Sequence, residues 1–83
     1  MRYPVAIEPG DDSRAWGVVV PDLPGCFSAG DTLDEAIEKA REAIELHIDG
    51  LLDDGEAVPI ARPVGEHQAR AEFSGWIWAV VEI

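Results

Sequence analysis

The chain has 83 residues, 47% of them hydrophobic, which is enough for one small folded domain and too few for two. Seventeen acidic residues against six Lys and Arg give a formal net charge of −11, and the six cations are scattered along the sequence. Without a basic patch to neutralise phosphates, the chain should repel nucleic acid and anionic membranes and attract a basic partner.

The single cysteine and the short apolar runs indicate the cellular compartment. Cys26 has no second cysteine to pair with, which excludes a disulfide-stapled secreted scaffold and fits a reducing cytosol. The N-terminal residues lack the apolar core of a signal peptide, and the longest apolar run, Trp76–Val81, is far too short to span a bilayer. We therefore expect a cytoplasmic protein without a membrane span.

The first third of the chain predicts three short strands. Arg2–Glu8 alternates apolar and other residues, and the dense turn signal Pro9–Ser13 separates it from a second strand, Arg14–Val20. These two strands should form an antiparallel hairpin. Pro24-Gly25 suits the centre of a type II turn, so Cys26–Ala29 is predicted as a short third strand.

A long helix follows. Thr32 and Glu35 stand at the spacing of a capping box, in which each side chain bonds the other residue's backbone N–H, and Asp53-Asp54-Gly55 ends the helix with Gly at the C′ position. At about 100° per residue, one face collects apolar side chains. They are Leu33, Ala36, Ile37, Ala40, Ala43, Ile44, Ile48 and Leu51.

The last third predicts a connector, a short helix and a final strand. Ala57–Val64 contains two prolines, Gly65–Glu72 is predicted as a short second helix, and Trp76–Ile83 as a strand that is apolar on both faces except for Glu82. The resulting β-β-β-α-(α)-β order predicts a small α/β (α+β) sandwich. A right-handed crossover through the main helix would bring the last strand beside the first and parallel to it.

This arrangement gives a mixed four-stranded sheet in the order 3-2-1-4, with the main helix on one face. The other face lacks a long helix, and the final strand is apolar on both sides. We therefore expect at least a homodimer, formed through the uncovered sheet face or through an exposed strand edge.

The stretch Pro21–Ala36, PDLPGCFSAGDTLDEA, resembles the HicB family of antitoxins. The opening strand at Tyr3–Ile7, the Gly17–Pro24 segment and the closing Trp78–Ile83 strand resemble the family as well, so the similarity covers the whole chain. The resemblance implies a degraded, partial ribonuclease H-like domain, residues 1–83, that binds and neutralises the HicA toxin. That toxin is a small basic protein that cleaves mRNA using a histidine.

The chain also departs from the family pattern. HicB proteins usually continue into a helix-turn-helix or ribbon-helix-helix domain that binds the operator, and this sequence ends at Ile83. The resemblance therefore implies a single antitoxin domain without the C-terminal DNA-binding domain, and we expect no operator binding by this chain alone.

The outer face of the helix offers a candidate toxin-binding surface. Five carboxylates fall within about 80° of one another on a helical wheel: Asp34, Glu38, Glu42, Glu45 and Asp49. One interpretation is a phosphate-mimicking stripe that meets the basic toxin. The other is an ordinary solvated face, with Glu35 and Lys39 as a stabilising pair at i,i+4.

A metal-dependent nuclease is the enzymatic alternative. Ribonuclease H chemistry needs three or four carboxylates that converge on two Mg²⁺ ions. If the first and last strands are parallel, Glu8 and Glu82 lie near the same ends of neighbouring strands, and Asp34 at the start of the helix approaches them. The other interpretation is that these carboxylates are simply solvated strand ends, and it agrees with the loss of nuclease activity that the resemblance implies. We expect no catalytic residue, no metal and no cofactor.

The remaining reactive or aromatic residues favour a structural role. His47 on the apolar side of the helix and His67 in the short second helix are interpreted as satisfied core residues. One cysteine and two distant histidines form neither a zinc motif nor a nucleophile pair. The three tryptophans lack interleaved Lys or Arg, which favours core or interface over base stacking.

Taken together, the sequence predicts a non-enzymatic antitoxin domain that covers the RNA-binding or catalytic surface of a HicA-like toxin. The sequence also permits two other functions: a metal-dependent ribonuclease H-type nuclease, and an adaptor module for some other basic protein.

Overall fold

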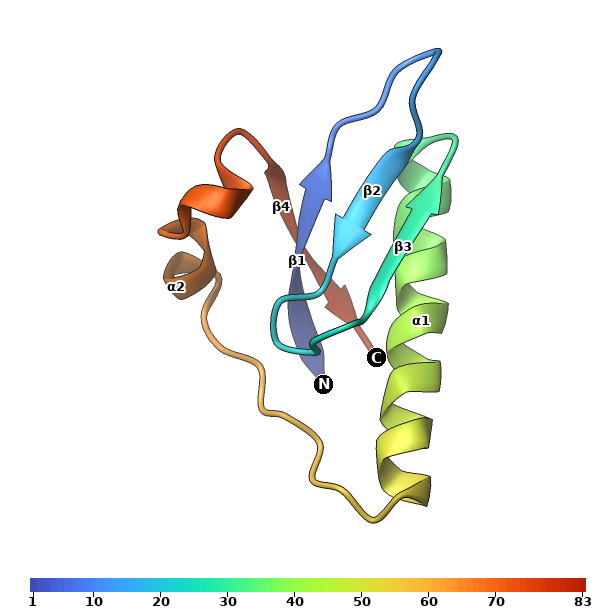
Figure 1. Ribbon diagram of the computed structural model, residues 1–83, viewed down its shortest axis with the longest axis vertical. Coiled ribbons are helices and arrows are strands. Elements are labelled where there is room, and N and C mark those ends of the chain that lie inside the picture. Colours follow the sequence, from blue (N-terminus) through green and yellow to red (C-terminus); the bar gives the residue numbers. More distant parts are fainter.

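A long helix packs on one face of a four-stranded sheet in the computed structural model, which describes residues 1–83 (Figure 1). The termini lie near each other at one end of the sheet. The elements are β1 (Arg2–Glu8), β2 (Trp16–Val19), β3 (Phe27–Gly30), α1 (Leu33–Asp53), α2 (Val64–Gln68), a 3₁₀ turn η1 (Ala71–Phe73) and β4 (Ile77–Glu82).

The first three strands form the expected antiparallel meander, although β2 is shorter than the predicted Arg14–Val20. Gly25 has a φ of +83°, the left-handed conformation that the Pro24-Gly25 turn requires. β3 is shifted by one residue from the predicted Cys26–Ala29 and ends at Gly30, where only glycine fits. A Cβ at this position would lie 2.6 Å from the backbone nitrogen of Ala36.

The strand order β3-β2-β1-β4 confirms the prediction, but the predicted direction of the last strand is wrong. β4 pairs antiparallel to β1, with Tyr3 opposite Val81 and Ile7 opposite Ile77, so the sheet is antiparallel throughout rather than mixed. The prediction took the main helix as a right-handed crossover that returns the chain to the starting end of β1. In the structure, residues 54–76 travel back along the sheet, and β4 therefore starts at the end where β1 finishes (Figure 1).

Both ends of α1 have the capping motifs predicted from the sequence, except that one of the two capping-box hydrogen bonds is missing. The Thr32 hydroxyl accepts a hydrogen bond from the Glu35 N–H at 3.1 Å, whereas the Glu35 side chain binds Lys39 Nζ at 3.0 Å instead of returning to the cap. The capping box is therefore only half formed. At the C-terminus, Glu56 N–H bonds Leu51 C=O and Gly55 N–H bonds Leu52 C=O, a Schellman motif around Gly55 with φ +71°.

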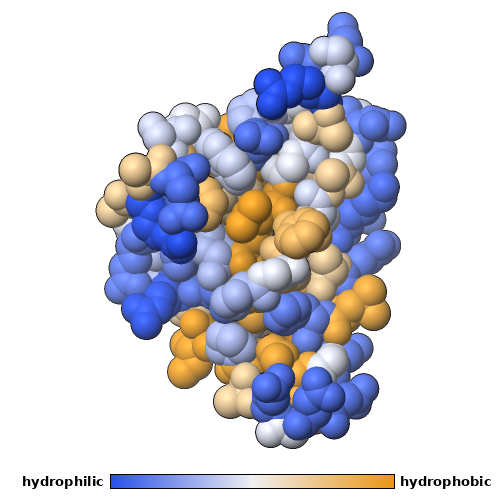
Figure 2. Space-filling model, viewed as in Figure 1, coloured by the Kyte–Doolittle hydropathy of each residue, from blue (hydrophilic) through white to orange (hydrophobic).

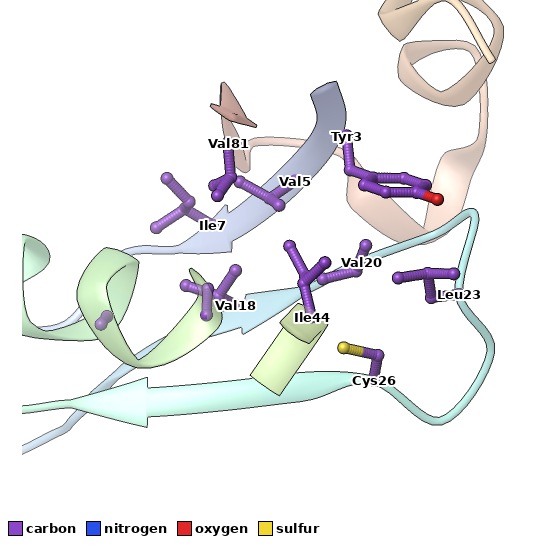
Figure 3. Close-up of a cluster of buried hydrophobic side chains, with 11 residues drawn as sticks. Tyr3, Val5, Ile7, Val18, Val20, Leu23, Cys26, Ile44 and Val81 are labelled. Carbon is purple, nitrogen blue, oxygen red and sulfur yellow. The ribbon is translucent and has the colours of Figure 1, made fainter. Parts of the chain in front are cut away.

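The main core lies between α1 and the sheet (Figure 3). Ala36, Ala40 and Ile44 supply the fully buried stripe of the helix, and the two small alanines let α1 approach β3 closely enough for Ser28 Oγ to donate to the Ala36 carbonyl. The sheet contributes Tyr3, Val5, Ile7, Val18, Val20 and Val81, with Leu23 and Cys26 from the β2–β3 turn.

The opposite face is only partly covered. The predicted second helix is divided into α2 and η1, which pack on the β4 residue Trp78 through His67 and Phe73. Elsewhere this face is open: Phe27 is 70% exposed and Val80 is 47% exposed. Figure 2 shows apolar side chains over the strands between the α2 segment and α1.

Candidate functional site

The outer face of α1 is a continuous acidic surface. The five predicted carboxylates, Asp34, Glu38, Glu42, Glu45 and Asp49, are all exposed, opposite the buried stripe of the helix. We call them the α1 acidic face. Hydrophilic side chains line the margin of the molecule along α1 in Figure 2. The structure brings the five together as the helical spacing predicted; their role in binding stays a prediction.

The negative charge of the protein is concentrated in and around this helix. Residues 31–56 contain ten acidic residues against Lys39 and Arg41, a net charge of −8. Residues 1–30 carry −2 and residues 57–83 carry −1. One side of the molecule therefore projects a strong negative potential, which would attract a basic partner and raise its association rate.

The two cations of α1 leave the acidic face intact. Lys39 binds Glu35, and this hydrogen bond and charge raise the pKa of the Lys39 ammonium above its usual value. Arg41 forms no ion pair. The pairing of Glu35 with Lys39 confirms the i,i+4 contact expected from the sequence.

A buried polar cluster joins residues 54–76, which we call the return segment, to the sheet. His67 Nε2 lies 3.1 Å from Asp22 Oδ1, and the two side chains are only 6% and 3% exposed. The Arg62 backbone N–H donates to the other Asp22 oxygen at 3.2 Å, and the imidazole stacks on Trp78 at a ring-centroid distance of 6.2 Å. His67 is thus a satisfied core residue, as predicted. Its partner was missed because 45 residues separate the two.

An open depression lies beside this cluster. It has a volume of about 800 Å³ and is lined by Pro21, Pro59, Ile60, Arg62 and Arg70, among others. Arg62 pairs with Glu66 at 3.3 Å and Arg70 with Glu72 at 2.8 Å. Each guanidinium group in this depression is therefore paired with an exposed carboxylate of the same chain.

The carboxylates proposed for a metal centre are not brought together. Because β4 is antiparallel to β1, Glu82 pairs with Arg2 while Glu8 lies at the other end of β1. Glu8 is six residue steps along β1 from Arg2, about 20 Å at 3.3 Å per residue. The structure contains no group of three or more His, Cys, Asp or Glu side chains arranged to bind a metal ion. The Glu8, Glu82 and Asp34 alternative is therefore wrong in its geometry.

The other singled-out side chains have structural roles. Cys26 is 4% exposed, and burial raises the pKa of its thiol. Trp16 packs against the main core, while Trp76 and Trp78 meet the Phe73 ring edge-on. The prediction of a satisfied core residue is wrong for His47, which is only half-buried on α1 and makes no side-chain hydrogen bond. No helix combines the length and apolarity that crossing a membrane requires.

Comparison with known proteins identifies the family. Residues 3–83 match the family described as HicB-like antitoxin of bacterial toxin-antitoxin system. The chain belongs to the HicB-like antitoxin family. Over all 83 residues it is 46% identical to an uncharacterised 14.9 kDa protein from the rep–hol intergenic region of Haemophilus phage HP1, of which it covers 61%. It spans between 42% and 48% of the length of the curated HicB antitoxins it matches.

Solved structures of HicB antitoxins have the same fold. The N-terminal domain of the Burkholderia pseudomallei antitoxin HicB superposes with a TM-score of 0.86 at 39% identity, covering all of this chain and 98% of that one. A chain of a HicA3–HicB3 toxin-antitoxin complex superposes with a TM-score of 0.79 at 30% identity, covering 100% and 98%. The sequence-based assignment to the HicB family is thus confirmed.

Proposed function

We propose that this HicB-like chain binds a HicA-like toxin and neutralises it by covering the toxin's RNA-binding or catalytic surface. The observation that carries the proposal is the likeness to a chain of the HicA3–HicB3 complex, which extends over the full length of this chain. The antitoxin acts by binding and performs no catalysis of its own, in the cytoplasm where the toxin meets mRNA. The separation of Glu8 from Glu82 is consistent with this role.

The α1 acidic face is the part of the surface that we assign to the toxin. A protein that holds RNA must present cations to phosphates, and residues 31–56 present a net charge of −8 to such a surface. All five carboxylates are exposed and lie on one rigid helix, so they can be desolvated together against a basic groove. Charge of this kind acts mainly on the association rate and on the choice of partner.

Charge reversal on α1 tests this assignment. Glu38→Lys, Glu42→Lys and Glu45→Lys together should slow association with a catalytically inactive HicA-like toxin tenfold or more at low ionic strength, and should flatten the salt dependence. Stopped-flow fluorescence measures both. A matched control, Asp12→Lys, Glu66→Lys and Glu72→Lys, changes the net charge equally at exposed positions away from α1. Equal association rates for the two variants would refute the role of the α1 acidic face.

Neutralisation needs a separate readout. Increasing amounts of the wild-type chain should abolish mRNA cleavage by active toxin at about equimolar ratio. If the chain binds the toxin while cleavage continues, the proposed function fails even where the charge-reversal result holds. If the chain does not bind this class of toxin at all, the adaptor alternative, with another basic protein as partner, takes its place.

A further inference from the structure

One ring nitrogen of the buried histidine His67 has no partner within the chain. Its Nε2 lies 3.1 Å from Asp22 Oδ1, whereas its Nδ1 makes no hydrogen bond. The side chain is only 6% exposed, yet no fully buried side-chain nitrogen or oxygen of the protein lacks a partner. Nδ1 must therefore reach solvent, and the depression beside the Asp22–His67 pair is the only one that His67 lines.

Asp22 determines which of the two ring nitrogens carries the proton. Its second oxygen accepts the Arg62 backbone N–H at 3.2 Å, so both carboxylate oxygens act as acceptors. Nε2 is then the donor to Asp22, and Nδ1 of the neutral ring carries a lone pair. The depression thus contains a hydrogen-bond acceptor that a buried carboxylate holds in a fixed orientation.

Two guanidinium groups line the same depression. Arg62 and Arg70 are two of the six cations of the chain. Their partners Glu66 and Glu72 are 54% and 59% exposed, and ion pairs at such positions contribute little to stability, so a ligand can displace them. The Arg70 guanidinium also lies 5.2 Å from the centre of the Phe73 ring, which restrains it. Guanidinium groups match the oxygens of a phosphate group in geometry and charge.

The rest of the lining favours binding over catalysis. Three prolines, Pro21, Pro59 and Pro63, form part of a stiff wall, and none of the lining residues is Ser, Thr, Cys or Tyr. The imidazole therefore has no nucleophile of the chain to activate. The depression lies on the α2 side of the molecule, whereas α1 and its acidic residues lie at the opposite margin (Figure 1). Salt at physiological concentration screens most of the charge at that separation.

We propose that this depression binds a phosphate monoester. A monoester has a second pKa of about 6, so near neutral pH part of it carries one P–OH group beside its anionic oxygens. The anionic oxygens accept hydrogen bonds from Arg62 and Arg70, and the P–OH group donates to His67 Nδ1. A sulfate, a carboxylate or a phosphodiester has no such proton near neutral pH, so each leaves the Nδ1 acceptor without a donor.

Inorganic phosphate is the first probe, added to the full 83-residue chain at neutral pH. Long-range proton–nitrogen NMR follows the ring nitrogens of His67, with His47 on α1 as the internal control. Phosphate at tens of millimolar should shift the His67 Nδ1 resonance and leave His47 unchanged. Sulfate has a similar size but no proton to donate, and it should bind about tenfold more weakly, the effect of one missing hydrogen bond to a charged group.

Substitutions of the charged residues test the contacts to the anionic oxygens. Arg62→Gln and Arg70→Gln should each weaken the binding of both phosphate and sulfate about tenfold. Arg41→Gln is the matched control, because it removes an exposed cation from α1 and should change neither affinity. Glu66→Gln removes the carboxylate that competes with phosphate for Arg62, so it should strengthen binding.

His67→Gln tests the contact to the proton. Glutamine keeps a side-chain donor for Asp22 but lacks the Nδ1 acceptor, so phosphate should lose its advantage over sulfate. Backbone amide resonances of residues 59–70 show whether the variant is folded and report its binding. A folded His67→Gln variant that still prefers phosphate would overturn the proposal, as would sulfate that binds the wild type as tightly, or a His67 Nδ1 resonance that phosphate leaves unshifted.

Two monoesters then identify the source of the phosphate group. A capped phosphoserine peptide represents a phosphorylated partner protein, and glycerol 3-phosphate represents a small metabolite. Both should bind, and the tighter of the two assigns the site to its class. Dimethyl phosphate, a diester without a P–OH group, should bind about tenfold more weakly than either. Equal binding of the diester and the monoesters would contradict the role of the P–OH group.

Discussion

Replacing His67 by alanine should strongly destabilise the fold. The substitution leaves the Asp22 carboxylate 3% exposed, with the Arg62 N–H as its remaining hydrogen-bond donor, and it removes the ring stacked on Trp78. Removing the hydrogen-bond partner of a buried polar group costs about 1–3 kcal/mol, and the space left by the packed ring adds to this loss. A chain of this size has a total stability of about 4–12 kcal/mol, at 0.05–0.15 kcal/mol per residue, so the loss is a large part of the whole.

Urea denaturation followed by tryptophan fluorescence measures this loss, and Trp78 reports on the cluster directly. His47→Ala is the matched control, because His47 is half-buried on α1 and makes no side-chain hydrogen bond; it should shift the free energy of unfolding by less than about 1 kcal/mol. Asp22→Ala together with His67→Ala should cost less than the sum of the two single changes, because neither partner is left unpaired. A loss below about 1 kcal/mol for His67→Ala would refute the reasoning.

Four further outcomes follow from the structure. Burial raises the pKa of the Tyr3 hydroxyl, so the folded state holds the phenolic proton more tightly than the unfolded chain does. The free energy of unfolding should therefore be unaffected below about pH 10 and should fall as the pH rises through the pKa of Tyr3 in the folded state. Tyr3→Phe should remove this alkaline loss in urea titrations. Cys26 is buried with a raised pKa, so a thiol reagent should label it slowly in buffer and rapidly in urea. Gly30→Ala should cost about 1–3 kcal/mol, because its Cβ meets the Ala36 backbone, whereas Gly17→Ala has ordinary contacts at 3.8 Å and should be tolerated. Mobility-shift assays at moderate salt should show no specific retention of operator DNA by this chain, since its acidic surface releases no counterions from phosphates.

The local elements could be predicted because their signals lie within a few residues. The Thr32 cap, the apolar repeat through Ala36, Ala40 and Ile44, and the Gly55 end place α1 where the structure has it. The same periodicity placed the α1 acidic face in solvent. These features depend on backbone geometry and helix phase, which the sequence states directly.

The direction of β4 could not be predicted from such local signals. It is decided by residues 54–76, in which two prolines and two short helical turns give no indication of which end of the sheet the chain reaches. The mistaken metal cluster followed from that one error, since Glu8 and Glu82 meet only if β1 and β4 are parallel. The Asp22–His67 contact depends on the same return path, so it also lay beyond the local signals.

The central position of β1 between β2 and β4 has a consequence for folding during synthesis. Six of the seven β1 residues pair with residues 77–82, so one side of this first strand stays unpaired until those much later residues have been made. Until those residues leave the ribosome, the nascent chain holds an open backbone edge, and the polar bonds that fasten the return segment are incomplete. Pairing over so long a sequence separation also slows folding, since the loop must close before the contacts form. The domain is therefore complete only after residues 77–82 have left the ribosome, and the interval before that is when aggregation or proteolysis would remove it.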